Sequence, residues 1–509
     1  MIENLIWGSA LRLFQVLVFS SLWVVMGFVI AAVFRVMVGA EKTRATFGNS
    51  QGWQGIFYGW LWGMLLPVCS LGAIPVVREL HRSGVRGGTL IAFALTVPLF
   101  NPLSVLYGLT LSDPIAILVF AFCTLVIVSL VGLIWDRFFP HHTTEVDIVD
   151  PPIDYGLKRI VAVFKTMSEM VRSPSTLLIL LGIFGSVTIS VVLPHGAMST
   201  MLERDNWLAP LTVAILGIPI YSTPLLAMSQ IGSMFQHGNS IGAAFSLLIF
   251  GAGVNLGLIA CFFQLLGAKK TIGFLGMLAA IGLGLAYLIS EPLFPKGIEI
   301  AGHTHAFDVY TNPFAGSSNY SQSALQEMGT FWRQNEFGGS FLLAGLIGLG
   351  VLFPLLPGGQ RLNHWLSQRS SNIGKDLILP DWAMRTVAIV GLFALSAIGC
   401  FVYYPPPGES LEQMQHVNLD VHAASRGEWE IASRGIELQE SWSRLLEVGY
   451  FIRKGHLSEF HRIKARILRE RLELLRHAVE DQDMEEAQYY VKEADRAYRR
   501  LSRAFQANQ

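Results

Sequence analysis

The chain has 509 residues, of which 52% are hydrophobic and only 15% are charged, whereas a soluble domain usually carries about 25% charged residues. Its 37 basic and 37 acidic side chains balance, so the net charge gives no reason to expect nucleic acid as a partner. This composition excludes an ordinary soluble protein and predicts an integral membrane protein with a densely charged soluble tail at 405–509.

Long apolar runs predict the membrane-spanning helices, because a helix needs about 20 apolar residues to cross a hydrocarbon core of about 30 Å. The first run, 13–38, is too long for a cleaved signal peptide, so we expect it to be retained as the first span. In chain order, the eight expected spans are 13–38, 88–110, 115–135, 175–193, 240–265, 272–290, 339–356 and 385–404.

Two further apolar regions, 54–83 and 209–237, are interrupted near their middles by proline, glycine and serine. Each has two arms of roughly 12 residues, or about 18 Å of helix, which reaches only to the middle of the membrane. Such a region is either one broken span or a re-entrant hairpin that returns to its own side.

The positions of lysine and arginine distinguish these alternatives, because short cytoplasmic loops collect basic residues. If both regions are hairpins, one side holds 17 basic residues: Arg35, Lys42, Arg44, Arg78, Arg82, Arg86, Arg137, Lys158, Arg159, Lys165, Arg172, Lys269, Lys270, Arg361, Arg369, Lys375 and Arg385. The other side then holds four outside the tail: Arg12, Arg204, Lys296 and Arg333. If both regions span, this bias disappears. We therefore predict two re-entrant hairpins, with both chain termini extracytoplasmic.

The two halves of the apolar region resemble each other in sequence. Three residues recur at a constant offset of 154: Gly84 as Gly238, Gly88 as Gly242 and Asn101 as Asn255. With two residues of slack, Pro67-Val-Cys69-Ser70 aligns with Pro219-Ile-Tyr221-Ser222. Broken apolar segments at matching positions of two halves are typical of a transporter's binding site. Because the hairpins enter from opposite faces, the repeats, about 54–135 and 209–290, are predicted to be inverted.

The hairpin tips carry candidate substrate-binding residues. The second arm of the first hairpin is expected to start near Ala73, so its unpaired N–H groups point at the membrane centre. Cys69 adds a soft sulfur ligand and Ser70 a hydroxyl, although a buried cysteine is often only a small hydrophobic residue. The candidate contacts at the two tips are Cys69, Ser70, Gly72, Tyr221, Ser222 and Thr223.

Two asparagines extend this candidate site. Pro98 and Pro102 are expected to interrupt the span 88–110 and to free backbone carbonyls beside Asn101. The repeat puts Asn255 at the same position of the second half. Both amides are therefore candidates for substrate contact, and hydrogen bonding between helices is the alternative.

Charged and metal-capable side chains are sparse in the apolar region. Arg78 and Glu79 lie in a returning arm, where charges are often functional, although a long arginine can instead reach the membrane surface. In the outer loop, His303, His305 and Asp308 have ligand types that bind transition metals, but a solvated loop gives the same pattern. No paired acids or nucleophile–base set lies at the membrane centre, so we predict neither an enzyme nor a cofactor.

Two amphipathic regions lie outside the predicted spans. The stretch 157–171 has the pattern of a helix on the inner membrane surface, although a simple connector fits as well. In the tail, apolar residues recur at steps of three and four, which predicts a bundle of three or four helices with Trp429 and Trp442 in its core. We expect this bundle to bind an extracytoplasmic partner or a second copy of the chain.

The run PxCSxGxIP at 67–75, followed by a glycine, an apolar helix and an Asn-Pro pair, resembles the predicted-permease family that includes organoarsenical efflux permeases. The resemblance covers roughly residues 10–290 and implies a bacterial inner-membrane permease; some members export trivalent organoarsenicals and most have no assigned substrate. The family tip usually reads Cys-Ser-Cys-Gly, and here Leu71 replaces the second cysteine, so a two-thiolate arsenic site is not implied. Arg78 and Glu79 replace residues that are usually small or apolar, and 291–509 extends beyond the smaller members.

The predicted fold is an all-α membrane protein with eight transmembrane helices, two re-entrant helical hairpins in inverted repeats and a C-terminal soluble helical bundle. Its parts are a permease core at 1–290, an extracytoplasmic loop at 291–338, two additional transmembrane helices at 339–404 and an extracytoplasmic bundle at 405–509. We expect an inner-membrane permease that exports a small soft or anionic solute, metalloid or organometalloid-like, by alternating access where the two tips meet. The alternative is a membrane sensor or assembly platform whose bundle binds an extracytoplasmic partner.

Overall fold

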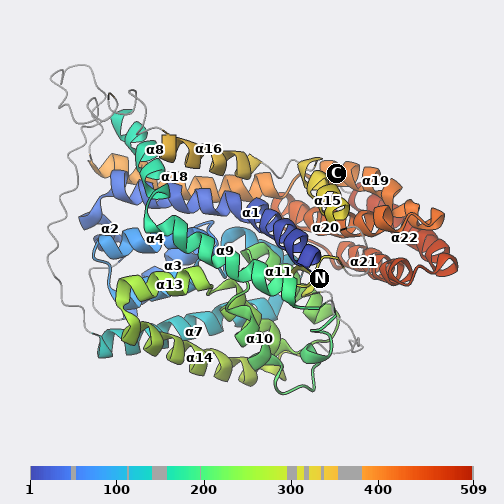
Figure 1. Cartoon of the computed structure of the whole chain (residues 1–509), viewed down its shortest axis with the longest axis horizontal. Helices are drawn as coiled ribbons and strands as arrows, with labels where there is room; N and C mark the ends of the chain where they lie inside the picture. The colour runs from blue at the N-terminus through green and yellow to red at the C-terminus, as the bar shows by residue number, and fades with distance from the viewer. Residues whose placement is uncertain are drawn as a thin grey trace. The chain divides into compact units, whose positions relative to one another are not determined.

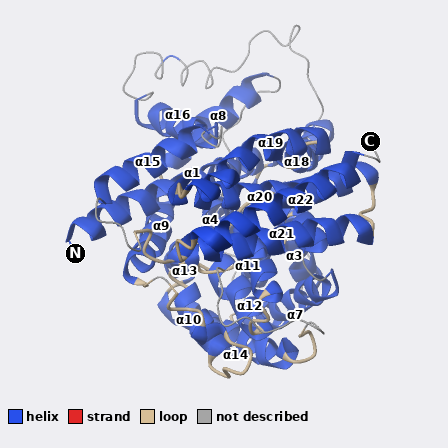
Figure 2. Cartoon of the chain, turned by 90° about the vertical axis from the view of Figure 1, so that its right-hand side faces the viewer, coloured by secondary structure: helices blue, strands red, loops and turns tan. Residues whose placement is uncertain are grey.

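The computed structural model describes residues 2–47, 53–111, 114–139, 157–194, 196–294, 306–314, 320–333, 338–352, 361 and 381–506. Over these residues the chain is helical and has no strand (Figure 2), apart from one isolated β-bridge between Glu203 and Asn239. It divides into two compact units. The first comprises Met1–Val105 and Ile115–Ser396, and the second comprises Leu106–Pro114 and Ala397–Gln509. The all-α class is as predicted.

The first half of the chain begins with its longest helix, α1, which packs against α4, α8, α9, α15 and α16 (Figure 1). The elements of this half are α1 (Ile2–Val33), the π-helical η1 (Phe34–Val38), α2 (Ala40–Thr46), α3 (Trp53–Leu65), α4 (Ser70–Arg82), α5 (Gly87–Thr96), α6 (Pro102–Leu111), α7 (Pro114–Phe138) and α8 (Leu157–Val171). The amphipathic stretch is thus a helix with the expected bounds, and it packs on α1 and α16.

The second half repeats the alternation of long and broken helices. Its elements are α9 (Pro174–Val192), η2 (Thr200–Leu202), α10 (Ala209–Gly217), α11 (Pro224–Gln236), α12 (Ile241–Ser246), the π-helical η3 (Leu247–Ala252), α13 (Leu256–Leu266) and α14 (Ala268–Ser290). The later elements are η4 (Asp308–Tyr310), α15 (Tyr320–Arg333), α16 (Gly338–Leu352) and α18 (Asp381–Tyr403).

Five stretches among the described residues are long and apolar enough to cross a membrane: Glu3–Val38, Pro114–Phe138, Pro174–Val192, Ala268–Ser290 and Ile389–Arg426. The chain is therefore a multi-pass membrane protein. Two of the eight expected spans are interrupted: 88–110 is two short helices, because Pro98 and Pro102 break it as expected, and 240–265 bends by 57° between η3 and α13. α16 covers the described part of the expected span 339–356, whose last four residues lie outside the described residues.

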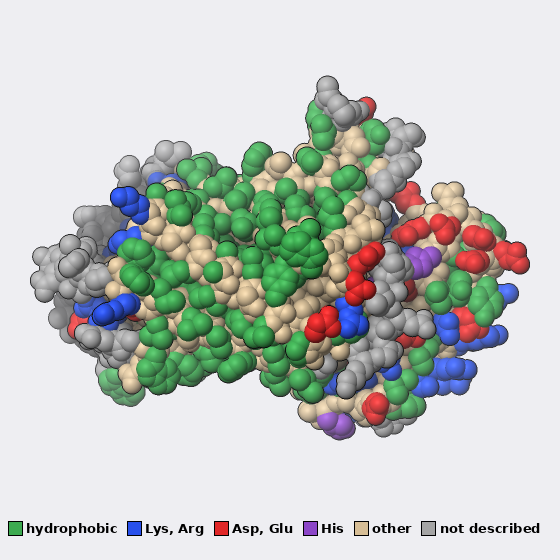
Figure 3. Space-filling model, turned by 90° about the horizontal axis from the view of Figure 1, so that it is seen from below, with side chains coloured by type: hydrophobic (Ala, Val, Ile, Leu, Met, Phe, Trp, Pro, Cys, Tyr) green, Lys and Arg blue, Asp and Glu red, His purple; other side chains and the backbone are tan. Residues whose placement is uncertain are grey.

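The surface of the first unit agrees with a lipid environment. Hydrophobic side chains cover most of its visible face in Figure 3, and Lys and Arg gather at one end of it. Ile115, Leu118 and Phe122 are exposed along one face of α7, as are Leu177, Leu181 and Phe184 along α9. Soluble monomers rarely expose apolar patches of this extent, so these faces contact lipid.

The two halves make matching contacts at positions 154 residues apart. The Gly88 N–H donates to Asp136 Oδ1 at 2.9 Å, and the Gly242 N–H donates to Ser290 Oγ at 3.3 Å. Gly84 and Gly238 occupy the turns before these residues with φ of 77° and 66°, a conformation that glycine adopts without strain. The helix that follows each hairpin, α5 or α12, therefore begins against the end of the long helix of its half, α7 or α14, in the same way.

The second unit contains the tail helices α19 (Pro407–Val421), α20 (Trp429–Lys454), α21 (Glu459–Glu480) and α22 (Met484–Gln506), with the 3-10 turn η6 (His422–Arg426) between the first two. Their apolar faces form one buried cluster, and Trp429 and Trp442 are partly buried against it. Glu447 and Arg469 form an ion pair inside this unit and are 1% and 8% exposed. Burial raises the pKa of Glu447, and the neighbouring arginines oppose that shift.

Candidate functional site

Tip 1, residues 66–72, is the turn between α3 and α4. Pro67 has no N–H to donate and restricts the residue before it, so α3 ends there and the backbone unwinds. α4 begins at Ser70, and Cys69 is its N-cap: Cys69 Sγ accepts a hydrogen bond from the Gly72 N–H at 3.4 Å. Both Cys69 and Ser70 are fully buried, so tip 1 brings a thiol and a hydroxyl into the interior of the unit.

Tip 2, residues 218–224, is the turn between α10 and α11. α11 begins at Pro224, whose fixed φ suits the first helical position. Thr223 is its N-cap, and Thr223 Oγ1 accepts a hydrogen bond from the Leu226 N–H at 3.2 Å. Thr223 follows Cys69 by 154 residues, so the two caps occupy equivalent positions of the two halves.

Asn101 and Asn255 lie at the two helix breaks, before α6 and α13. In both, the side-chain Oδ1 accepts a hydrogen bond at 2.9 Å from the backbone N–H three residues later. This use of Oδ1 fixes the amide orientation and leaves Nδ2 free to donate. The breaks also adjoin, because a Cβ on Gly253 would lie 3.0 Å from the Leu99 side chain.

The two tips meet inside the first unit. The Cys69 thiol and the Tyr221 hydroxyl lie next to each other. Leu71 of tip 1 and Asn255 both lie against α9 at Gly182, where a Cβ would be 2.6 Å from the Leu71 side chain and 2.9 Å from Asn255 Oδ1. Segments that are about 150 residues apart in sequence thus converge on one place.

Among the buried polar atoms without a hydrogen-bond partner in the described part of the chain, five belong to the tips, the two helix breaks and the adjoining α9: Ser70 Oγ, Asn101 Nδ2, Ser186 Oγ, Tyr221 OH and Asn255 Nδ2. Each of these residues is at most 3% exposed. Folded proteins pair the great majority of such groups, and each unpaired group costs about 1–3 kcal/mol. The tips therefore have unused capacity to hydrogen-bond a polar solute or water.

The remaining predicted tip residues have protein contacts. Gly72 lets α4 approach α1 closely, because a Cβ there would lie 2.4 Å from the Trp23 carbonyl oxygen. Ser222 Oγ lies 3.2 Å from the Thr223 carbonyl oxygen and 3.3 Å from Gln230 Oε1. Gln230 in turn donates from Nε2 to the carbonyl oxygen of Ala306 at 2.7 Å, so tip 2 is tied to the segment 306–314.

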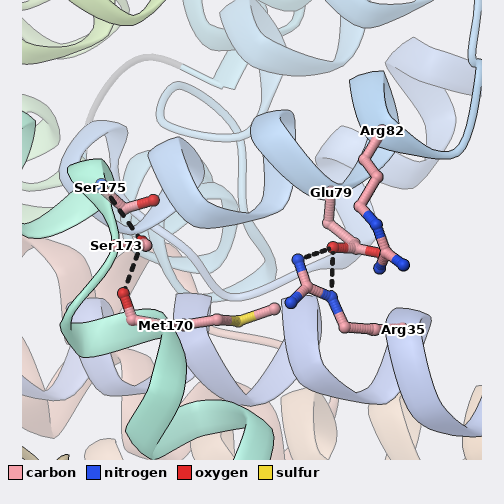
Figure 4. A network of polar contacts seen from close by, with 6 residues as sticks. All are labelled: Arg35, Glu79, Arg82, Met170, Ser173 and Ser175. Atoms are coloured by element: carbon pink, nitrogen blue, oxygen red, sulfur yellow. Dashed lines mark hydrogen bonds and ion pairs between the residues drawn. The ribbon is translucent and has the colours of Figure 1, made fainter. Parts of the chain in front are cut away.

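Arg78 and Glu79 lie near the far end of α4, away from tip 1. Glu79 is 2% exposed, and its carboxylate accepts hydrogen bonds from Arg35 Nε at 2.7 Å and from Arg82 Nη1 at 3.1 Å (Figure 4). Arg78 Nη1 donates to Gln264 Oε1 at 3.0 Å. These contacts join α4 to the end of α1 and to α13, so the structure gives both residues a positioning role in the packing.

A small cavity beside tip 2 adds residues that the sequence reasoning missed. Its volume is about 30 Å³, and Arg12 of α1, Ser186 of α9, Tyr221, Thr223 and Tyr310 of η4 line it. Arg12 is the lone basic residue at the start of the first apolar run, and a charge in that position is often functional. That was the one signal of this cavity visible in the sequence.

The predicted outer-loop metal site is only partly visible. His303 and His305 lie outside the described residues, and Asp308 begins η4. Within the described ranges, no three His, Cys, Asp or Glu side chains are grouped so as to hold a metal ion.

Comparison with known proteins gives one family and one weak relative. A family model described as "Predicted permease" matches residues 6–291. The UPF0718 protein YcgR of Bacillus subtilis (strain 168) is 27% identical over 89 residues, which are 18% of this chain and 30% of that protein. The chain thus spans less than a third of that relative's length. No solved structure matches this chain.

Proposed function

The chain belongs to the predicted permease family, and from this premise we propose an inner-membrane permease that exports a small soft or anionic solute, metalloid or organometalloid-like. The solute binds where tip 1 and tip 2 meet. The observation that carries this proposal is the group of five buried polar atoms without protein partners at that place. A bound solute that hydrogen-bonds them offsets the cost of their burial.

Each half contributes similar chemistry to this site. Cys69 and Ser70 supply a thiol and a hydroxyl from tip 1, and Tyr221 supplies a hydroxyl from tip 2. Asn101 and Asn255 supply amide donors from the two helix breaks. The solute is held by hydrogen bonds and one soft ligand; a single thiol binds a soft centre more weakly than a pair would.

We propose that α3–α4 and α10–α11 are re-entrant hairpins. α3 follows α2, and α4 returns to pack on α2 and to pair Glu79 with Arg35 of η1. In the second half, the Ser240 N–H donates to the Leu202 carbonyl oxygen at 3.0 Å. This contact brings the end of α11 back to the segment that precedes α10. Both patterns support hairpins that leave on the side where they enter.

The hairpins are proposed to enter from opposite faces. Arg78, near the returning end of α4, contacts Gln264 just before the start of α14. Gly242, just after the returning end of α11, contacts Ser290 at the other end of α14. α14 has 23 residues, or about 35 Å of helix. This separation supports inverted repeats whose tips meet midway.

The basic end of the first unit sets the proposed orientation. Arg35, Arg78 and Arg82 lie together at the returning end of α4, and cytoplasmic ends collect such residues. Tip 1 is therefore proposed to enter from the cytoplasm and tip 2 from outside, with both chain termini outside. Alternating access then exposes the tips to one side at a time.

Solute flux from proteoliposomes tests the site. Asn101→Ser and Asn255→Ser keep an N-cap oxygen but remove the Nδ2 donors, so the proposal expects flux to fall about 10-fold in each, as for one lost hydrogen bond. Asn206→Ser is the matched control, because Asn206 Oδ1 also accepts a hydrogen bond from a backbone N–H, that of Leu208 at 3.0 Å, but Asn206 is half-buried in the turn before α10 and away from the tips. Normal flux in both site variants would contradict the site.

A further inference from the structure

The cavity beside tip 2 shares Ser186, Tyr221 and Thr223 with the groups described above and adds Arg12 and Tyr310. Its volume of about 30 Å³ has room for one or two groups the size of water. Four segments far apart in sequence enclose it: α1, α9, tip 2 and η4. A cavity this small takes a chemical group of a solute or a small ion.

Most of the cavity lining is apolar, with Val16, Phe19, Leu226 and Val309 among its residues, and a few polar groups stand in it. Arg12 is 8% exposed, and it is the only charged side chain among the described residues that line the cavity. Its guanidinium donates from Nη1 to Gln15 Oε1 at 2.8 Å, and from Nη2 to the carbonyl oxygens of Asp308 at 3.1 Å and Thr311 at 2.7 Å. These bonds fix the position of the cation at the cavity wall.

Two buried hydroxyls also line the cavity. Ser186 Oγ and Tyr221 OH are buried and have no hydrogen-bond partner within the described residues. The neighbouring Ser190 differs, because its Oγ donates to the Ser186 carbonyl oxygen at 2.8 Å. Gln15, which accepts a hydrogen bond from Arg12, also donates from Nε2 to the carboxylate of Glu327 at 2.8 Å.

We propose that this cavity recognises a small oxyanionic group, such as a carboxylate or a phosphonate, with Arg12, Ser186 and Tyr221 as its donors. A planar guanidinium with adjacent hydroxyls suits oxygen anions, because hydrogen bonds to charged oxygens are the strong ones. The inference rests on the proposed function, since Tyr221 also faces Cys69 and so connects the anion to the tips. It narrows the solute class to molecules that carry such a group.

Thermal unfolding of the full-length protein in detergent tests this inference. Sodium methylphosphonate and sodium acetate are titrated separately, each against sodium chloride at equal ionic strength, because a ligand of the folded state raises the midpoint in a saturable way. We expect such a rise with methylphosphonate or acetate and none with chloride. Ser186→Ala and Tyr221→Phe should each weaken the apparent affinity about 10-fold, as for one hydrogen bond to a charged group.

The matched control is Thr188→Ala. Thr188 lies on the same helix, but its Oγ1 is exposed and donates to the Phe184 carbonyl oxygen at 2.8 Å, so this variant should bind as the unmodified protein does. Arg12 is less suitable, because its removal also releases the backbone at Asp308 and Thr311. Ser186→Ala and Tyr221→Phe are separate variants, so either one tests the site if the other does not fold.

The inference is overturned if neither anion raises the midpoint above chloride, or if Ser186→Ala and Tyr221→Phe bind as Thr188→Ala does. The binding measurement tests the oxyanion site, and the flux measurement tests the tip site. If Asn101→Ser and Asn255→Ser lose flux while no anion binds, only the oxyanion site is rejected. If anions bind and both asparagine variants transport normally, the tip site is rejected and the cavity stands.

Discussion

Cys69 and Thr223 are equivalent helix N-caps with different side chains. Each caps the helix that leaves its tip, at 3.4 Å for the thiol and 3.2 Å for the hydroxyl. A thiol is a weak hydrogen-bonding group, so the cap of α4 is the weaker of the two. The same sulfur faces Tyr221. Leu71, which lies between Ser70 and Gly72 at tip 1, is fully buried and supplies no second thiol. The soft chemistry at tip 1 therefore depends on one sulfur atom.

His461 of the tail predicts a dependence of stability on pH. Its ring packs against Tyr450 and Phe505, and its Nε2 lies 3.2 Å from the Ala504 carbonyl oxygen. Burial lowers the pKa of His461 below the usual 6.5. The unfolded tail then binds more protons than the folded tail, so stability is complete above about pH 6.5 and falls as the pH drops toward the folded pKa.

Hydrogen exchange of α21 peptides in the full-length protein measures this effect. We expect less protection at pH 5.5 than at pH 8 after correction for intrinsic exchange, with up to about a tenfold change in the opening equilibrium for each pKa unit. His461→Gln should remove part of that difference, and His416→Gln, at an exposed position of the same tail, should not. An equal loss of protection in both variants and the unmodified protein would assign the pH dependence to other groups.

At the scale of elements, the contact of α1 with α4 depends on glycine. A Cβ on Gly27 would lie 2.0 Å from the Gly72 carbonyl oxygen, which is backbone and cannot rotate away. Gly27→Ala therefore forces the two helices apart and should destabilise the protein by about 1–3 kcal/mol. The measurement is the midpoint of thermal unfolding in detergent.

Gly276→Ala is the control for that variant. Gly276 lies in α14 with nothing within 4 Å of an added Cβ, so alanine should be neutral or favourable by up to about 1 kcal/mol, as expected from helix propensity. If both substitutions leave the midpoint unchanged, the close approach of α1 and α4 is not rigid.

Local chemistry made some elements predictable from the sequence. Proline lacks a backbone N–H donor, so Pro98 and Pro102 predicted the break before α6. The recurrence of apolar residues at steps of three and four predicted the helices of the tail. The bend before α13 was missed, because that span contains no proline and turns at Gly253 and its neighbours.

The sequence predicted only those candidate site residues that a pattern within one segment, or its repeat in the other half, makes visible. The offset of 154 residues identified Asn101 and Asn255, but prolines misaligned the tips: the pairing of Cys69 with Tyr221 is corrected by the caps to Cys69 with Thr223. The cavity next to tip 2 was not foreseen, because its lining comes from four segments. Such a site depends on tertiary packing, which periodicity does not report.

The whole molecule depends on which side of the membrane each hairpin leaves. Solvent-side labelling with a membrane-impermeant maleimide tests this in cells and in inverted vesicles, on a chain whose four native cysteines are serine. Single cysteines are placed at the exposed Trp53 and half-buried Arg86, which flank the first hairpin, and at the exposed Trp207 and Gln236, which flank the second.

If the hairpins are re-entrant, Trp53→Cys and Arg86→Cys react only from the cytoplasm, and Trp207→Cys and Gln236→Cys react only from outside. Each pair must agree within itself, because a re-entrant segment returns to the side where it enters. One arm of 13 residues, about 20 Å of helix, is too short to cross a core of about 30 Å by itself. A pair that reacts from opposite sides would mean that its segment spans the membrane. The tips would then meet by chance of packing rather than by symmetry, and the opposed directions of approach that alternating access needs would be lost.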